Sequence, residues 1–150
     1  MKVVLQRVSR ASVTTDEHFE AIEQGFLLLV GIGEETVEAD LTAMAKKIST
    51  ARLFEDDMGK MNRSIQDVAG SILSISQFTL YADVRKGNRP SFTKARTPDE
   101  ASKMYDQFNE LLRRENLTVK TGIFGADMAI ELINDGPVTL IYESRDGKIQ

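Results

Sequence analysis

The sequence predicts a single mixed α/β domain in which two helices cover one face of a sheet that also packs on other strands. Two observations support this fold class. Apolar residues are continuous or alternate, as in strands, through most of the chain, but in two segments they recur three and four residues apart, as on one face of a helix. The 150 residues are 41% hydrophobic, which is enough for one buried core, and no repeat or linker divides them.

Strands are expected before the first helix. Residues 1–8 alternate and are rich in valine, which predicts a strand. Residues 11–15 and 19–22 flank the polar turn 16–18 and predict a hairpin. Residues 25–32 form a continuous apolar run, which is typical of a buried strand.

The first helix is expected at residues 37–48, where the apolar residues share one helical face. Negative charge near a helix start is favoured by the helix dipole, and four acidic residues occur there: Glu34, Glu35, Glu38 and Asp40. Short strands are then expected at residues 51–55 and 60–65, around a turn. A stronger strand is expected at residues 71–80.

The second helix has the clearest start signal. Thr97 and Glu100 have the spacing of a capping box, with Pro98 at the first helical position, and Arg113 and Arg114 suit the C-terminal end. Closing strands are expected at residues 118–121, 128–133 and 138–142. The polar tail, residues 143–150, is expected to be loosely held.

Composition disfavours several kinds of chemistry. Without cysteine there is no thiolate nucleophile and no cysteine zinc site. The only histidine, His18, lies in the expected hairpin turn, where a solvated side chain is the ordinary outcome, so a Ser-His-Asp triad is not favoured. Asp56, Asp57 and Gly59 suggest a calcium loop, but the other ligands of such a loop are absent. We therefore expect neither a metal nor a cofactor.

Charge and hydropathy limit the partners and the location. The net charge of −4 is unlike that of proteins that grip long nucleic acids, so any RNA is expected to bind through a local patch or by one end. No apolar run approaches the roughly 18 residues of a membrane span. The first residues lack a signal-peptide pattern, so a cytoplasmic protein without membrane association is expected.

A glycine turn offers one alternative function. Gly31-Ile32-Gly33 follows a buried strand and precedes a helix, which is the position of a dinucleotide-binding loop. The third glycine position is occupied by Thr36, and Glu34 and Glu35 would repel a pyrophosphate. A tight turn is the simpler interpretation, and a non-catalytic nucleotide-binding or regulatory module is the alternative.

Two segments carry polar groups where a strand or turn does not need them. Ser76, Gln77 and Thr79 fall at the end of the expected strand, where unpaired polar groups cost free energy unless they are used. Residues 134–139 have the composition of a hairpin loop, but Pro137 directly follows Gly136, and a Gly-Pro bond of this kind can be cis for a geometric purpose.

A third segment is marked by its positive charge. Residues 84–98 contain no acidic residue, and Phe92 within them offers a face for stacking. Five basic residues are candidates for contacts with phosphates: Arg85, Lys86, Arg89, Lys94 and Arg96. A solvated loop is the simpler alternative.

Together these segments resemble the D-aminoacyl-tRNA deacylase family. The likeness is carried by residues 76–80, 86–92 and 134–139, and it extends over roughly residues 1–142. Weaker similarity is present at residues 6–8 with 11–13, and at residues 59–62.

The resemblance implies a homodimer with a three-layer α/β/β fold of mixed, largely antiparallel sheets. It implies hydrolysis of D-aminoacyl-tRNA to free D-amino acid and tRNA, and removal of glycine mischarged on tRNA. The pocket for the terminal adenosine and the aminoacyl group would be formed by Ser76, Gln77, Phe78 and Thr79. The Gly136-Pro137 loop of the partner subunit, with its peptide bond cis, would complete that pocket.

Elementary chemistry is compatible with such an activity. An aminoacyl ester is already activated, and backbone N–H groups after Ser76 could stabilise the oxyanion. The ribose 2′-OH of the tRNA supplies a nearby hydroxyl by proximity. Thr79 is an alternative nucleophile, but its motif contains no candidate base. D- and L-substrates carry the same groups, so a wall that rejects the L side chain discriminates best, and glycine would pass it.

Overall fold

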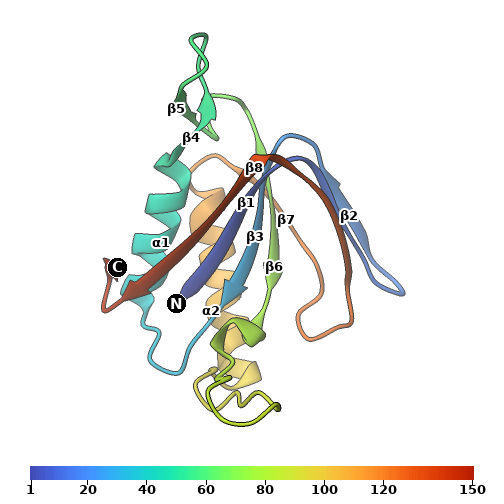
Figure 1. The fold of residues 1–150 in the computed structure, drawn as a ribbon, viewed down its shortest axis with the longest axis vertical. Helices are drawn as coiled ribbons and strands as arrows, with labels where there is room; N and C mark the ends of the chain where they lie inside the picture. The colour runs from blue at the N-terminus through green and yellow to red at the C-terminus, as the bar shows by residue number, and fades with distance from the viewer.

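The fold is built on one curled mixed sheet with two helices packed on one of its faces, as seen in a computed structural model of residues 1–150 (Figure 1). The sheet has the order β7-β6-β3-β1-β8-β9, and β2 pairs with the far half of β1. Its strands are β1 (Lys2–Thr14), β2 (Phe19–Ile22), β3 (Gly25–Gly31), β6 (Ser71–Ser76), β7 (Thr118–Thr121), β8 (Ala129–Arg145) and β9 (Lys148–Ile149).

The remaining elements are two helices, a separate hairpin and a single turn of 3₁₀ helix. The elements are α1 (Glu38–Thr50), α2 (Pro98–Arg113), the hairpin of β4 (Arg52–Glu55) and β5 (Met61–Ser64), and η1 (Phe78–Tyr81). The hairpin projects from one end of the molecule, and η1 lies near the opposite end (Figure 1). The pairs of β1 are antiparallel, whereas β3-β6 and β6-β7 are parallel, which confirms a mixed and largely antiparallel sheet.

Two hydrophobic cores explain the layers. The larger core lies between the sheet and the helices, and Phe26, Met44 and Phe108 are fully buried there. The smaller core includes Val13 and Leu73 and lies where the long strands β1 and β8 curl over the other face of the sheet. Alternate residues of β1 are buried, as expected for a strand that faces a core. Helices, sheet and curled sheet make the three layers that were expected.

Two expected breaks in strands are absent. The segments 1–8 and 11–15 form one strand, β1, and the segments 128–133 and 138–142 both belong to β8. Both halves of β8 pair with β1, and the register shifts between the pairs Gln6↔Thr139 and Val8↔Asn134. The segment 135–138 is therefore a bulge opposite Arg7, and the expectation of a hairpin loop was wrong. Bulges of this kind are frequent beside active sites.

The expected strand at residues 71–80 is shorter. It ends at Ser76, and the chain turns directly into η1. The start of α2 also differs from expectation. Thr97 is the N-cap residue and Pro98 takes the first position, but the Thr97 side chain makes no capping bond. The Glu100 carboxylate instead pairs with Arg96 at 3.2 Å, so the expected capping box does not form.

The tail is held in place, contrary to expectation. Ser144 is buried, and its hydroxyl donates a hydrogen bond of 2.6 Å to the Asp40 carboxylate. The amide of Gly147 donates to the same carboxylate at 2.8 Å. Burial acts to raise the pKa of Asp40, but these bonds and one from the Val37 amide outweigh it, so the pKa lies below its ordinary value. No helix has the length and apolar character needed to cross a membrane.

Candidate active site

The end of β6 forms one wall of a pocket of about 300 Å³. Ser76, Gln77 and Phe78 contribute to it, and α2 provides Tyr105. The opposite wall comes from the segment that leads into β8, residues 124–128. Most of the lining is apolar, and a volume of this size lies at the lower end of the range for small-ligand sites.

The turn from β6 into η1 provides free backbone donors beside the pocket. The amide of Gln77 continues the parallel ladder by donating to the Val30 carbonyl at 2.8 Å. The first bond of η1 runs from the Leu80 amide to the Gln77 carbonyl at 3.3 Å. The N–H groups of Phe78 and Thr79 precede that bonded amide and have no partner within the helix. These two N–H groups are the candidates to bind an anionic oxygen.

Thr79 lies one step outside the pocket. Its side chain is exposed, and its hydroxyl accepts a hydrogen bond of 2.6 Å from Gln77 Nε2. The structure thus brings Ser76, Gln77 and Phe78 together at the pocket and leaves Thr79 on the rim. No histidine or carboxylate is hydrogen-bonded to the Thr79 hydroxyl.

A buried polar cluster supports the strand end from behind. The Tyr105 hydroxyl donates to the Ser74 carbonyl at 2.7 Å. Burial raises the pKa of Tyr105 above its ordinary value, which favours the protonated hydroxyl that donates this bond. Ser74 Oγ and Asn109 Oδ1 are buried without a hydrogen-bond partner. The bond from Tyr105 thus ties the last residues of β6 to α2 by a polar contact as well as by packing.

The bulge of β8 carries the Gly136-Pro137 pair, whose peptide bond is cis. Both residues are exposed, whereas Val138 beside them is buried. Asn134 spans the bulge: its Oδ1 accepts from the Val138 amide at 2.8 Å, and its Nδ2 donates to Thr139 Oγ1 at 3.0 Å. The base of the loop is thus closed by side-chain bonds.

Arg7 fixes the same loop from beneath. Its side chain is only 6% exposed, and its Nε donates to the Asp135 carbonyl at 2.9 Å. Its Nη1 donates to the Leu53 carbonyl in β4 at 2.8 Å. Gly136 has φ +139°, and a Cβ there would lie 2.8 Å from Val138 Cγ2 and 3.2 Å from Arg7 Nη2. The site thus requires glycine at this position.

The loop and the pocket of the same chain are far apart. Arg7 of β1 lies opposite the loop and pairs with Phe26 of β3. Phe26 pairs in turn with Ile72 of β6, and Ser76 lies four residues farther along β6. That offset is roughly 13 Å along the strand, and the three strand spacings from β8 to β6 add roughly 14 Å across the sheet. The two features therefore lie roughly 20 Å apart.

The basic residues divide into three groups. Arg96 is mostly buried and donates to the carbonyls of Glu34 and Thr36, at 2.6 and 2.7 Å. Arg85 is exposed but forms an ion pair with Asp83, whose carboxyl pKa is held well below its usual range by the bonds from Arg85. The remaining three are exposed and form no ion pair within the chain: Lys86, Arg89 and Lys94.

The glycine turn is occupied by groups of the protein itself. A Cβ on Gly33 would lie 2.5 Å from the Tyr81 ring, so the ring packs against the glycine. The Gly33 amide donates to Thr36 Oγ1 at 2.9 Å, and its carbonyl accepts from Arg96 Nε at 3.1 Å. These contacts engage the amide and the carbonyl of Gly33, so its N–H is not free to bind a pyrophosphate, and the geometry does not favour the nucleotide-binding alternative.

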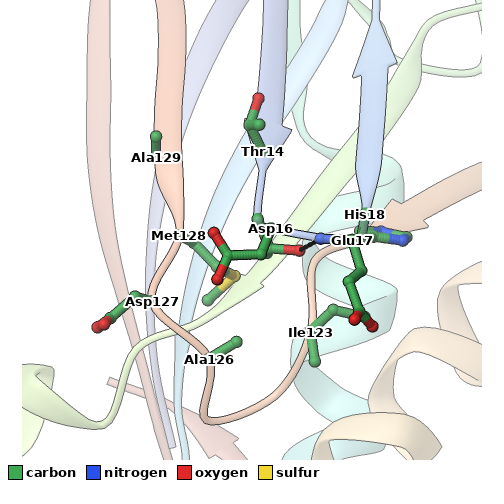
Figure 2. Close-up of a pocket in the computed structure, with 10 residues that line it drawn as sticks. Thr14, Asp16, Glu17, His18, Ile123, Ala126, Asp127, Met128 and Ala129 are labelled. Atoms are coloured by element: carbon green, nitrogen blue, oxygen red, sulfur yellow. Dashed lines mark hydrogen bonds between the residues drawn. The ribbon is translucent and has the colours of Figure 1, made fainter.

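A wide groove borders the pocket on its far side. It has a volume of about 930 Å³ and shares the segment 126–128 with the pocket. Figure 2 shows that the carboxylates of Asp16, Glu17 and Asp127 gather around it. The groove is acidic, so phosphates are not expected to approach the pocket from this side.

His18 was expected to be solvated, but its Nε2 lies 2.8 Å from the Thr121 carbonyl. No group of three or more His, Cys, Asp or Glu side chains is placed to hold a metal.

Comparison with known proteins identifies the family. The family model described as D-Tyr-tRNA(Tyr) deacylase matches residues 4–143. The chain belongs to this family. A protein of Staphylococcus haemolyticus (strain JCSC1435), named D-aminoacyl-tRNA deacylase, is 62% identical over 149 residues, which cover 99% of both chains. A Staphylococcus aureus (strain bovine RF122 / ET3-1) protein of the same name is 60% identical over 150 residues and the full length of both.

Solved structures agree with the deacylase fold. One described as "c-Myc DNA Unwinding Element Binding Protein" is 44% identical, with a TM-score of 0.88 over 96% of this chain and 99% of that one. Another, described as a probable eukaryotic D-amino acid tRNA deacylase, is 15% identical, with a TM-score of 0.82 over 93% and 97% of the chains. The second likeness concerns the fold alone.

Sequence reasoning assigned no role to Arg7, although residues 6–8 were among the segments that resemble the family. The signal was present, because alternation along β1 places Arg7 on the same inward side as Val3 and Leu5. A buried arginine needs several acceptors, and only the three-dimensional structure identifies them as the carbonyls of Leu53 and Asp135.

Replacing Arg7 tests how the loop is held. Arg7→Met keeps much of the volume but leaves two carbonyls without their donor, so we expect the free energy of unfolding to fall by about 2–4 kcal/mol. Hydrogen exchange at the Val138 amide should accelerate more than exchange in β3. Urea denaturation and exchange mass spectrometry measure the two effects. The matched control is Arg63→Met, which removes an exposed ion pair with Asp57 and should cost no more than about 0.5 kcal/mol.

Proposed function

We propose that this protein is a D-aminoacyl-tRNA deacylase that hydrolyses the ester between a D-amino acid and the terminal adenosine of tRNA. The observation that carries the proposal is the turn from β6 into η1. It brings Ser76, Gln77 and Phe78 to an apolar pocket and leaves the N–H groups of Phe78 and Thr79 without helical partners. Family membership supports the same reaction. Since aminoacyl-tRNA is made and used in the cytoplasm, that is the proposed location.

The chemistry proposed here needs no side-chain nucleophile. The two free N–H groups would stabilise the oxyanion that develops on the ester carbonyl. The vicinal ribose 2′-OH of the substrate would assist the attacking water, because a hydroxyl fixed beside the reacting carbon has a high effective concentration. Thr79 would keep the Gln77 side chain in place through their 2.6 Å hydrogen bond. No cofactor takes part in this scheme.

The active unit in this proposal is a homodimer. The Gly136-Pro137 loop lies too far from the pocket of its own chain, but a two-fold axis would carry it to the pocket of a partner. Strand β8 exposes Ile133 before the loop and Ile141 after it, and these side chains are 47% and 79% exposed. Exposed apolar side chains flanking an exposed loop are typical of a surface that is covered by another subunit.

The enzyme would select D-substrates by excluding the side chains of L-substrates. The loop is fixed by Arg7 and Asn134, so its carbonyls can face the substrate amino group without adapting to the side chain. An L side chain would then meet the loop, whereas a D side chain would point into the apolar pocket. Glycine has no side chain to reject, so glycine mischarged on tRNA is included among the proposed substrates.

The tRNA is proposed to enter from the basic side of the pocket. Lys86, Arg89 and Lys94 are the exposed, unpaired cations there, and Arg85 joins them if phosphate competes with Asp83. Arg96 belongs to the original set of candidates, but its guanidinium is engaged by three carbonyls and Glu100. Its contribution would be to hold the turn before α1 in position.

Mixed dimers test the sharing of the site. Ser76→Tyr should block the pocket of its own chain, and Gly136→Ala should distort the loop that serves the partner, so each variant alone should be nearly inactive. Random reassembly of equal amounts gives half mixed dimers, each with one intact pocket of two, and should restore about a quarter of wild-type activity. Differently tagged subunits allow the mixed species to be purified and assayed. Inactive mixed dimers would show that each chain completes its own site.

Substrate and enzyme variants separate the two proposals for attack. Thr79→Ala should retain activity within about tenfold, because the hydroxyl only positions Gln77. A D-tyrosyl-tRNA that ends in 2′-deoxyadenosine should react at least about a hundredfold more slowly. Single-turnover rates of ester release measure both. An inactive Thr79→Ala enzyme whose parent still cleaves the deoxy substrate would establish Thr79 as the nucleophile.

Salt dependence tests the proposed phosphate contacts. The double change Lys86→Ala and Arg89→Ala should weaken tRNA binding and lower the slope of log K against log[salt] by roughly 1.4–1.8. Lys46 and Lys103, exposed on the helices, provide the matched double-alanine control and should leave the slope unchanged. Arg96→Ala should mainly lower the melting temperature. Equal slopes for the wild type and the loop variant would exclude this surface from tRNA binding.

A further inference from the structure

We propose that Phe92 is a stacking platform for the unpaired nucleobase that precedes the terminal adenosine of bound tRNA. This base subsite rests on the proposed function, since it presumes that the adenosine occupies the pocket at Ser76. It would explain how a protein of negative net charge holds an RNA by its end alone.

Phe92 lies one aromatic ring outside the pocket. Phe78 contributes to the pocket wall, and the ring centroids of Phe78 and Phe92 are 5.0 Å apart with an interplanar angle of 66°. The edge-to-face arrangement keeps the two rings as a pair. A chain that leaves the pocket past Phe78 therefore meets Phe92 next.

Core packing does not explain these rings. Phe78 is 56% exposed and Phe92 is 36% exposed, and neither belongs to either hydrophobic core. Exposed aromatic rings that alternate with cations are the usual surface for single-stranded nucleic acid, where each base stacks on a ring and the cations follow the phosphates.

The backbone on both sides of Phe92 is fixed. The amide of Asp83 donates to the Ser91 carbonyl at 2.7 Å, and the Ser91 amide returns a bond of 3.0 Å, which closes the neck of an exposed loop. The carbonyl of Phe92 accepts from the Ala95 amide at 3.1 Å. A ring that projects from a fixed backbone loses little freedom on binding, which favours its use as a platform.

Three exposed cations lie close to Phe92 along the chain. The loop closed by Asp83 and Ser91 carries Lys86 and Arg89, and Lys94 follows Phe92 by two residues. The acidic groove with Asp16 and Asp127 lies on the other side of the pocket. Charge thus directs an RNA strand along the side on which Phe92 lies.

Three minimal substrates isolate the base from its phosphate. They are 3′-O-D-tyrosyl-adenosine, the same ester on cytidylyl-adenosine, and a dinucleotide with an abasic ribose in place of the cytidine. For the wild-type protein, KM should be roughly tenfold lower or more for the cytidine dinucleotide than for the abasic one, with similar kcat. Phe92→Leu should abolish that difference, and Phe92→Tyr should preserve it.

The same assay distinguishes failure of this inference from failure of the proposed function. If D-tyrosyl-adenosine is hydrolysed but the cytidine and abasic dinucleotides have equal KM, the base subsite is refuted while the deacylase proposal stands. If Phe92→Leu changes all three substrates alike, or shifts the dimer equilibrium in sedimentation, the ring serves packing or the subunit contact, and the proposal is overturned. If no D-tyrosyl ester is hydrolysed by the wild type, both proposals fail.

Discussion

The arrangement of the site depends on one buried guanidinium. Arg7 lies in β1 where the register with β8 shifts, and it links two carbonyls that belong to different parts of the chain, Asp135 in the bulge and Leu53 in the hairpin. A lysine could not link them in the same way, because it lacks the planar fork of donors. Without this contact only the bonds of Asn134 at the base would hold the loop, and its tip would be less firmly placed on the surface.

The position of the bulge separates the Gly136-Pro137 loop from the pocket of its own chain. A regular β8 would present no loop at all, and a loop placed nearer to β6 could serve its own pocket. The observed register places the loop roughly 20 Å from that pocket, at the other end of the sheet. In an isologous dimer each loop would reach the pocket of the other chain, so one contact surface would complete both sites. Catalytic groups and chiral selection would then come from different subunits.

The sequence predicted the regions of α1, α2 and the strands from β1 to β8, but not their continuity, and it missed η1 and β9. Period and apolar runs located β3, α1 and α2 because each buries one defined face. The breaks in β1 and β8 were expected at polar or turn residues, but pairing along a common partner keeps each strand continuous. The polar tail was misjudged for a similar reason: the buried Asp40 carboxylate that holds Ser144 and Gly147 lies more than a hundred residues away. Local patterns contain no information on such distant partners.

For the site, sequence motifs identified the segments but not the state of each side chain. The five cations of the basic segment look alike in the sequence, yet their partners differ. Arg96 donates to carbonyls, Arg85 pairs with a carboxylate, and the other three are exposed and unpaired.

The distribution of the unpaired cations limits the kind of RNA that can approach the pocket. They lie on one side of the pocket, the acidic groove lies on the other, and the net charge of the chain is negative. A long RNA helix would be repelled by most of the surface, whereas a flexible single-stranded end can follow the one basic approach to the pocket.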